Sequence, residues 1–348
     1  MLDGIAGGIA SIGSGIDIAG VRVGNAQDAE GGTGCTVVLC EDGAVGACDV
    51  RGGGPATRET DLLRPENAVE AVNAIVLSGG SAFGLAAATG VMRYLEERGR
   101  GFETGVLNVP IVCGASIFDL GVGDAHAWPD DAMGYGACVA ADGISALAEG
   151  NAGAGMGATV GKLFGGRGMM KSGLGVAGVQ AGRLVVDAIV SVNAAGTVVD
   201  AHGEPIAGVL LEDGSGIVPA RMAELQMIAG MQAMADTAGE EAAELGTATT
   251  GNPVENTTIC CVVTNGTLSK AHACKAASMC HDGYARAIEP VHTSMDGDTV
   301  FVLATGEVPA TMDMVGSLGA IAVEEAIRRA VRAAEPAFGL ESASSIAR

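Results

Sequence analysis

A threonine at the start of an apolar segment is the side chain in this sequence best placed to act as a nucleophile. Residues 247–256 are polar and rich in turn-forming residues, and they lead directly into the apolar run 257–264. The hydroxyl of Thr257 could attack the carbonyl group of Asn256 and give an ester that water then hydrolyses. Thr257 would keep a free α-amine with a pKa near ~7.7–8, which is a base on the same residue as the nucleophile. The same pattern is also typical of an ordinary turn before a strand.

A pair of carboxylates stands before a second apolar run. Asp296, Gly297 and Asp298 open the segment 299–303. Carboxylates two residues apart point to the same side of an extended chain. The pair could therefore orient an ammonium group and a hydroxyl group, or it could simply cap a turn.

A lysine follows a glycine-rich stretch at residues 153–162. The stretch resembles a phosphate-binding loop, but Met156 stands where the first glycine is needed. Leu163 also replaces the hydroxyl residue that would bind Mg²⁺, so the phosphate loop is excluded. If it were desolvated, Lys162 could place a positive charge beside a developing oxyanion.

The remaining motifs do not indicate a cofactor or a metal. Residues 173–178 match the dinucleotide pattern GxGxxG, but the strand-like residues 183–186 follow where a helix is required. Four possible metal ligands occupy a predicted helix without the spacing of a structural zinc site. They are His272, Cys274, Cys280 and His281. The GxSxG motif of serine hydrolases of the α/β-hydrolase type does not occur.

Charge and composition exclude several kinds of partner. The chain of 348 residues carries 41 acidic and 19 basic residues, so its formal net charge is −22. Nucleic acids and anionic membrane surfaces are therefore not expected partners. No apolar run approaches the ~18 residues of a membrane-spanning helix. The sequence begins without a basic, signal-like segment, and its nine cysteines form no CxxC pair, so we expect a reducing cytoplasm.

Hydrophobic periodicity predicts alternating strands and helices. Residues 35–50 read as a hairpin turning at Asp42 and Gly43, the strongest local turn signal in the chain. The other expected strands are 73–77, 183–193, 196–199, 207–211, 257–264 and 299–305, and the expected helices are 82–98, 268–288 and 314–334. Residues 220–246 are expected to be a helix or an acidic linker. The pattern predicts a layered α/β or α+β fold in a single domain, 1–348.

Several segments together resemble one known family. In chain order they are Arg51-Gly-Gly-Gly-Pro-Ala-Thr-Arg-Glu-Thr-Asp61, Leu77-Ser-Gly-Gly-Ser-Ala-Phe-Gly-Leu85, Val109-Pro-Ile-Val112, Ile117-Phe-Asp-Leu-Gly121, residues 153–162, Lys171-Ser-Gly-Leu-Gly175, Asn256-Thr-Thr-Ile259 and residues 290–299. The chain resembles the self-processing L-aminopeptidase/D-esterase (DmpA-type) family over nearly its whole length. That family includes β-peptidyl aminopeptidases and nylon-oligomer (6-aminohexanoate oligomer) hydrolases.

The resemblance implies a fold and a maturation step. The implied fold is a four-layer αββα sandwich like that of N-terminal-nucleophile hydrolases, with a different connectivity (DmpA/ArgJ-like). Cleavage between Asn256 and Thr257 would give a large chain, 1–256, and a small chain, 257–348. A homotetramer of processed units is implied as well.

The resemblance also implies residue roles. Thr257 is the expected nucleophile, and Asp296 and Asp298 are expected to orient and polarise it. Lys162 and Asn193 are expected to stabilise the oxyanion. The expected substrate-binding residues are Phe118 and Lys171, and no metal or cofactor is implied.

Two departures from the family leave the substrate open. The aminopeptidase branch has Ser and Glu where this chain has Asp296 and Asp298, and the nylon branch has Tyr where this chain has Phe118. The expected substrates are small peptides or ω-amino-acid oligomers. The alternatives are an aminopeptidase of unknown peptide specificity, an acyltransferase like the ornithine acetyltransferases, and an uncleaved oligomeric binding protein.

Overall fold

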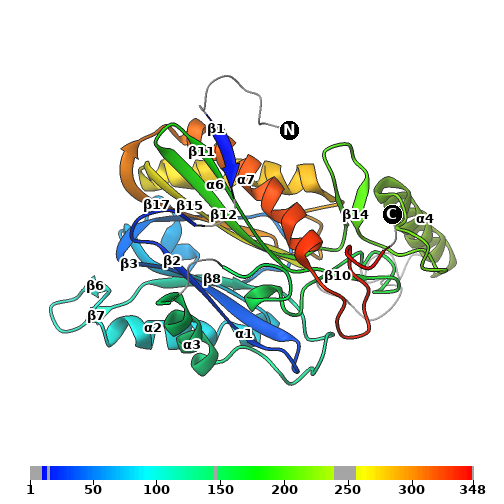
Figure 1. Ribbon diagram of the computed structural model, residues 1–348, viewed down its shortest axis with the longest axis horizontal. Helices are drawn as coiled ribbons and strands as arrows, with labels where there is room; N and C mark the ends of the chain where they lie inside the picture. Colours follow the sequence, from blue (N-terminus) through cyan, green and yellow to red (C-terminus); the bar gives the residue numbers. More distant parts are fainter. Residues whose placement is uncertain (1–9, 14–15, 144–146, 239–255, 347–348) are drawn as a thin grey trace.

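The structure, a computed structural model, contains one large mixed sheet. It describes residues 10–13, 16–143, 147–238 and 256–346. In this part of the chain the strand order is β1-β11-β12-β15-β17-β3-β5-β8-β4, and β2 pairs beside β3 (Figure 1). The strands of this sheet are β1 (Ala10–Gly13), β2 (Arg22–Asp28), β3 (Thr33–Val50), β4 (Ala56–Arg58), β5 (Ala71–Ser78), β8 (Val112–Ser116), β11 (Leu174–Ala181), β12 (Leu184–Asn193), β15 (Thr257–Thr267) and β17 (Thr299–Pro309).

Helices and shorter strands surround this sheet. The helices are α1 (Ser81–Gly84), α2 (Ala87–Glu96), α3 (Asp131–Ala141), α4 (Ala220–Ala238), α6 (Lys270–Ala287) and α7 (Met312–Ala333), with short 3₁₀ turns at Asp61–Leu63 and Gly153–Gly155. The shorter strands are β6 (Phe102–Glu103), β7 (Asn108–Val109), β9 (Thr159–Val160), β10 (Met170–Lys171), β13 (Thr197–Val199), β14 (Pro205–Ala207) and β16 (Ile288–Glu289). None of the described helices is long and apolar enough to cross a membrane.

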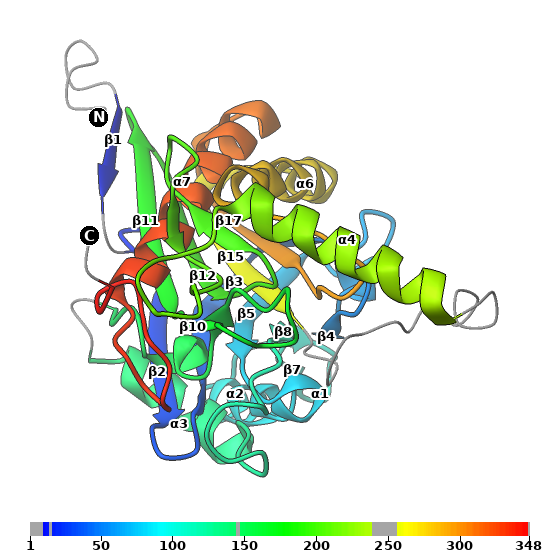
Figure 2. The same cartoon turned by 90° about the vertical axis from the view of Figure 1, so that its right-hand side faces the viewer.

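Three hydrophobic clusters show that the sheet folds over on itself into two layers. In β15, Cys260 and Val262 pack with α6 and α7, whereas Ile259 and Cys261 face the space between the two layers. The third cluster joins β3 and β5 to α2 and α3. Alternate residues of a strand point to opposite faces, so each central strand serves two interfaces. Figures 1 and 2 show α6 and α7 above the strands and α1 to α3 below them. The predicted αββα order is therefore confirmed.

The predicted hairpin at 35–50 is wrong, because these residues form the single long strand β3. Both parts of β3 pair with the same strand: Leu39 lies opposite Ala74 and Ala44 opposite Val72. The extra residues between them form a bulge, in which Gly43 has φ +85°. An Asp-Gly pair favours a left-handed backbone, and here that conformation kinks the strand without reversing it.

The other predicted elements have close counterparts. The predicted helix 82–98 is divided into α1 and α2, and the predicted strand at 207–211 is replaced by β14, which ends at Ala207. The GxGxxG match at 173–178 lies mostly in β11, which leads to β12 with no helix between them, as its sequence context indicated. Helix α4 covers the first part of 220–246, and residues 239–246 lie outside the described part of the chain.

Strand pairing brings three distant segments to one end of the sheet. The last residue of β12, Asn193, lies opposite Thr257, the first residue of β15. Strand β17 runs parallel to β15 with Thr299 beside Ile259, so residues 296–298 arrive at the same end. The predicted nucleophile and the predicted carboxylates are thus placed side by side by backbone pairing.

Close contact between α2 and α3 provides a test of the lower layer. A Cβ atom on Gly134 would lie 2.0 Å from the carbonyl oxygen of Ala87, whereas one on Gly136 of the same helix would meet nothing within 4 Å. We expect Gly134→Ala to lower the free energy of unfolding by about 1–3 kcal/mol through overpacking. Gly136→Ala should raise it by about 0.5–1 kcal/mol through helix propensity. Denaturant unfolding measures both, and a Gly134→Ala protein as stable as the unsubstituted one would contradict this packing.

Candidate active site

The bond between Asn256 and Thr257 lies buried at the end of the sheet. It lies next to residues 296–298, called here the aspartate loop. The Thr257 hydroxyl donates a hydrogen bond to the carbonyl oxygen of Asn256, with 2.5 Å between the two oxygens. The backbone N–H of Gly297 donates to the same carbonyl oxygen at 2.8 Å. This places a hydroxyl next to a peptide carbonyl whose oxygen already has a second, fixed donor. Amide donors of this kind stabilise the charge that develops on a carbonyl oxygen under attack.

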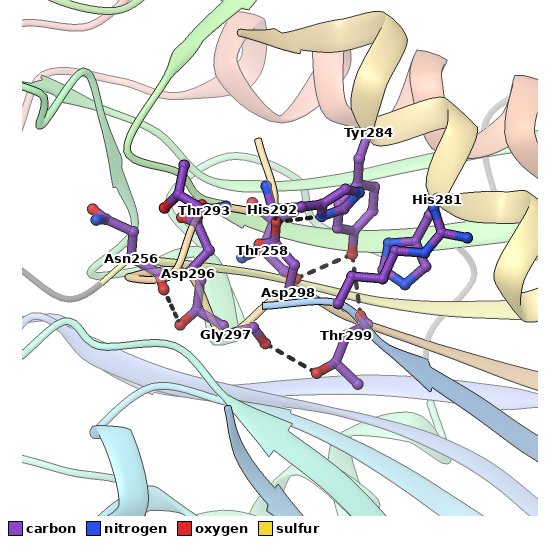
Figure 3. A network of polar contacts seen from close by, with 12 residues as sticks. Asn256, Thr258, His281, Tyr284, His292, Thr293, Asp296, Gly297, Asp298 and Thr299 are labelled. Atoms are coloured by element: carbon purple, nitrogen blue, oxygen red, sulfur yellow. Dashed lines mark hydrogen bonds and ion pairs between the residues drawn. The ribbon is translucent and has the colours of Figure 1, made fainter. Parts of the chain in front are cut away.

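Asp298 is buried and accepts three hydrogen bonds. Its Oδ1 accepts from the N–H of Thr258 at 2.7 Å, and its Oδ2 accepts from the N–H of His292 at 3.1 Å and from the Nδ1 of the same residue at 2.8 Å (Figure 3). The Asp298 carboxylate thereby fixes the backbone directly after the nucleophile.

Asp296 has a different environment. It accepts a hydrogen bond from the N–H of Thr293 at 2.7 Å, and the Thr293 side chain interacts with it as well. Burial, together with the negative charge of Asp298, raises the pKa of the Asp296 carboxyl to about 6, and the nearby charge of Lys162 acts in the opposite direction. Two neighbouring carboxyl groups with different environments can divide the roles of fixed anion and proton acceptor.

The glycine-rich segment after β3, residues 51–54, forms backbone hydrogen bonds with the aspartate loop. The N–H of Arg51 donates to the carbonyl oxygen of Asp298 at 3.0 Å, and the N–H of Gly54 donates to that of Asp296 at 2.9 Å. A Cβ atom on Gly52 would lie 2.2 Å from the carbonyl oxygen of Asp296. Glycine at position 52 is therefore needed for the close approach of the two backbones.

Lys162 and Asn193 are in direct contact next to this loop. Lys162 Nζ donates to Asn193 Oδ1 at 2.7 Å and to the Asn193 carbonyl oxygen at 3.0 Å. Burial lowers the pKa of the Lys162 ammonium to about 7, against the opposing charges of Asp296 and Asp119. The Asn193 amide nitrogen donates to the carbonyl oxygen of Phe118 at 2.9 Å. In the uncut chain, Asn193 thus holds Lys162 and the backbone of Phe118.

The two predicted substrate-binding residues have different positions. Phe118 is half-buried and joined to Asn193 through its backbone. Lys171 is fully buried, and its Nζ donates to the carbonyl oxygens of Gly155, Ala158 and Ser172. Burial lowers the pKa of Lys171 to about 7. Its contacts hold the glycine-rich segment that leads to Lys162, and a role for either residue in binding substrate stays a prediction.

Three residues of this region had no prediction from the sequence. Gly297 supplies a backbone donor, His292 contacts Asp298, and Asp119 accepts from Thr33 at 2.8 Å and from the N–H of Gly80 at 2.6 Å. Two of them could have been identified from the sequence, because Gly297 lies between two aspartates and Asp119 lies beside Phe118. The role of His292 depends on a loop conformation that the sequence pattern does not reveal.

The predicted metal-ligand candidates all lie on α6, as expected. His272 is exposed near its start, whereas Cys280 and His281 are buried near its end. Burial raises the pKa of the Cys280 thiol to about 12 and lowers the pKa of His281 to about 4. Cys280 therefore has the environment of a packed core residue.

Comparisons with known proteins identify the family of this chain. A family model described as peptidase family S58 matches residues 14–344. An uncharacterized aminopeptidase of Mycobacterium tuberculosis is 43% identical, covering 93% of this chain and 95% of that protein. A 6-aminohexanoate-oligomer endohydrolase of Kocuria sp. is 32% identical over 88% of this chain and 79% of that protein.

Solved structures show the same fold. The L-aminopeptidase D-Ala-esterase/amidase of Ochrobactrum anthropi, described as a variant of the Ntn hydrolase fold, superposes with a TM-score of 0.66 at 18% identity, covering 94% of this chain and 89% of that chain. A β-aminopeptidase of Burkholderia sp. superposes with a TM-score of 0.62 at 19% identity, covering 91% and 85%. With an Ntn-hydrolase fold and a family model matched over nearly its whole length, the chain belongs to peptidase family S58 and is a hydrolase of C–N bonds.

Proposed function

We propose that this protein cuts its own chain between Asn256 and Thr257 and then hydrolyses amide bonds with Thr257 as an N-terminal nucleophile. The observation that carries the proposal is the convergence of two groups on the Asn256 carbonyl oxygen. One is the Thr257 hydroxyl at 2.5 Å, and the other is the N–H of Gly297 at 2.8 Å. The nucleophile, the acceptor carbonyl and an oxyanion donor are then assembled before any bond is cut.

The self-cleavage proceeds in two steps. The Thr257 oxygen attacks the carbonyl carbon of Asn256 while Asp296 accepts the hydroxyl proton. The C–N bond then breaks, and the proton passes to the departing nitrogen, which becomes the α-amine of Thr257. Water hydrolyses the resulting ester, which leaves a carboxylate on Asn256 and restores the hydroxyl of Thr257.

Amide hydrolysis repeats this chemistry on a substrate. The α-amine of Thr257 takes the hydroxyl proton, and the oxygen forms an acyl-enzyme that water cleaves. The backbone N–H of Gly297 and the ammonium group of Lys162 stabilise the negative charge of the oxyanion. After the bond is cut, the amide nitrogen of Asn193 can donate a hydrogen bond to the oxyanion of the substrate. It does so by releasing the carbonyl oxygen of Phe118.

The substrates we propose are small peptides or ω-amino-acid oligomers with a free amine. Two buried carboxylates next to the nucleophile and a net charge of −22 favour a cationic end group. The endohydrolase named above acts on 6-aminohexanoate oligomers, and the resemblance of the Asp-Gly-Asp pattern to that branch supports the same class here. We further propose that the processed units form a homotetramer in the cytoplasm.

Acyl transfer to an amine is the second candidate within the same chemistry. An acyl-enzyme can pass its acyl group to an amine in place of water. An assay with an amine acceptor distinguishes the two, because a transferase forms the new amide with little free acid.

Substitution of the nucleophile tests the main proposal. We expect Thr257→Ala to stay a single folded chain with no amidase activity, since the attacking oxygen is removed. Thr257→Ser, which keeps a hydroxyl, should retain part of the cleavage. Intact mass and N-terminal sequencing of the small fragment measure both outcomes. A Thr257→Ala protein that is cut at this bond or hydrolyses amides would refute the assignment.

The carboxyl of Asp296 predicts a pH dependence. Its pKa of about 6 means that the proton-accepting form predominates above pH 6 and is lost below it. The rate of self-cleavage should therefore fall as the pH is lowered from 7 to 5, and Asp296→Asn should slow cleavage about 10²–10⁴-fold. The exposed Asp282 on α6 provides a matched Asp282→Asn control with an unchanged rate. Equal rates for Asp296→Asn and the unsubstituted protein would exclude this role.

A further inference from the structure

The contacts of His292 with Asp298 are more extensive than a loop residue needs. Both the backbone N–H and the ring Nδ1 of His292 reach the same carboxylate oxygen, at 3.1 and 2.8 Å. The other oxygen accepts from Thr258, the residue after the nucleophile. His292 is therefore two contacts away from Thr257, through a carboxylate that is itself buried.

The conformation of His292 is constrained from several sides. Its backbone has φ +58°, in the left-handed region that is uncommon for residues other than glycine, although asparagine, aspartate and histidine adopt it more often than the rest. Its ring stacks on Tyr284 with 5.6 Å between the centroids and meets the edge of His281 at 4.7 Å. Strained backbone of this kind is retained where the surrounding structure fixes it, and it is concentrated at functional sites. Here it aims the Nδ1 atom at Asp298 (Figure 3).

The contact also fixes a proton on the ring. Nδ1 can donate to a carboxylate only if it carries hydrogen, so the contact with Asp298 corresponds to the Nδ1–H tautomer. The Nε2 atom is buried and has no hydrogen-bond partner among the described residues. The ring therefore makes its hydrogen bond to Asp298 through Nδ1.

The other groups near His292 belong to α6 and to the end of β3 with the residue that follows it. Burial lowers the pKa of His281 to about 4, and burial holds the pKa of Tyr284 well above its usual value, so both are neutral. Asp49 contacts His281, with 3.0 Å between the carbonyl oxygen of Asp49 and the Nε2 atom of His281. Arg51 also lies near His281. Asp298 is thus the charged group that His292 contacts directly.

We propose that His292 is a positioning residue that holds the Asp298 carboxylate in place, and with it the backbone of Thr258 directly after the nucleophile. Asp296 is then the aspartate that gains and loses the proton during bond cleavage. His292 takes up no proton from Thr257 in this scheme: the hydroxyl proton moves to Asp296 and on to the departing nitrogen. This inference rests on the proposed function of Thr257.

A pair of substitutions tests the hydrogen bond from the ring. Asparagine tolerates the left-handed backbone and can donate from its amide near the position of Nδ1. We expect His292→Asn to cleave itself and to hydrolyse a 6-aminohexanoate oligomer within about threefold of the unsubstituted rate at pH 8, because the donor to Asp298 is kept. His292→Ala, which loses the ring donor, should be about 10²-fold slower at every pH, because the backbone at Thr257 is less well fixed.

Controls distinguish this inference from the proposed function. His272→Asn makes the same change on the exposed part of α6 and should leave the rate unchanged. A folded His292→Asn protein that is about 10²-fold slower than the unsubstituted protein would overturn the inference, because it keeps the donor. So would a folded His292→Ala protein of normal activity, and if the alanine variant does not fold, the rate of the asparagine variant decides alone. Cleavage or activity in Thr257→Ala would instead overturn the function itself.

Discussion

The parallel pairing of β15 with β17 is the constraint on which the site depends. Because the two strands start at the same end of the sheet, Asn256 and Asp296 form a bridge just before them, and Gly297 donates to the Asn256 carbonyl oxygen. Antiparallel pairing of β15 with β12 adds Asn193 at the same level. The reacting groups therefore come from strand ends in the middle of a large sheet, where backbone hydrogen bonds on both sides limit their movement.

This arrangement also explains how the large and small chains would stay together after cleavage. β15 and β17 belong to the expected small chain, and they lie between β12 and β3 of the large chain. Residues on both faces of β15 pack into hydrophobic clusters formed mostly by the large chain or by α6 and α7. Cleavage at Asn256 would thus release a terminus without releasing a strand.

Charge is balanced in a buried region where single ions would be costly. Lys162 and Lys171 lie near Asp119 and Asp296. Burial lowers the pKa of the two lysines and raises the pKa of the two aspartates, which favours the neutral form of each. Groups whose pKa values lie between about 6 and 7 exchange protons readily at neutral pH. The glycines contribute in a different way, because at Gly52 any side chain would push the aspartate loop away from its backbone partner.

The sequence by itself determined the elements with long, regular patterns and the residues with a chemical signature. The apolar run after Thr257 predicted β15, and the carboxylates of Asp296 and Asp298 before another apolar run predicted a pair at a strand start. Local pattern failed at Asp42 and Gly43, because the same left-handed backbone suits a turn and a bulge, and only pairing of both halves with β5 decides between them. The pattern could mark Gly297 between its two aspartates, but it could not show that the Gly297 N–H reaches the Asn256 carbonyl oxygen, and it gave no sign of His292. Both contacts depend on a loop conformation and on the neighbours that only the folded sheet brings within hydrogen-bond distance.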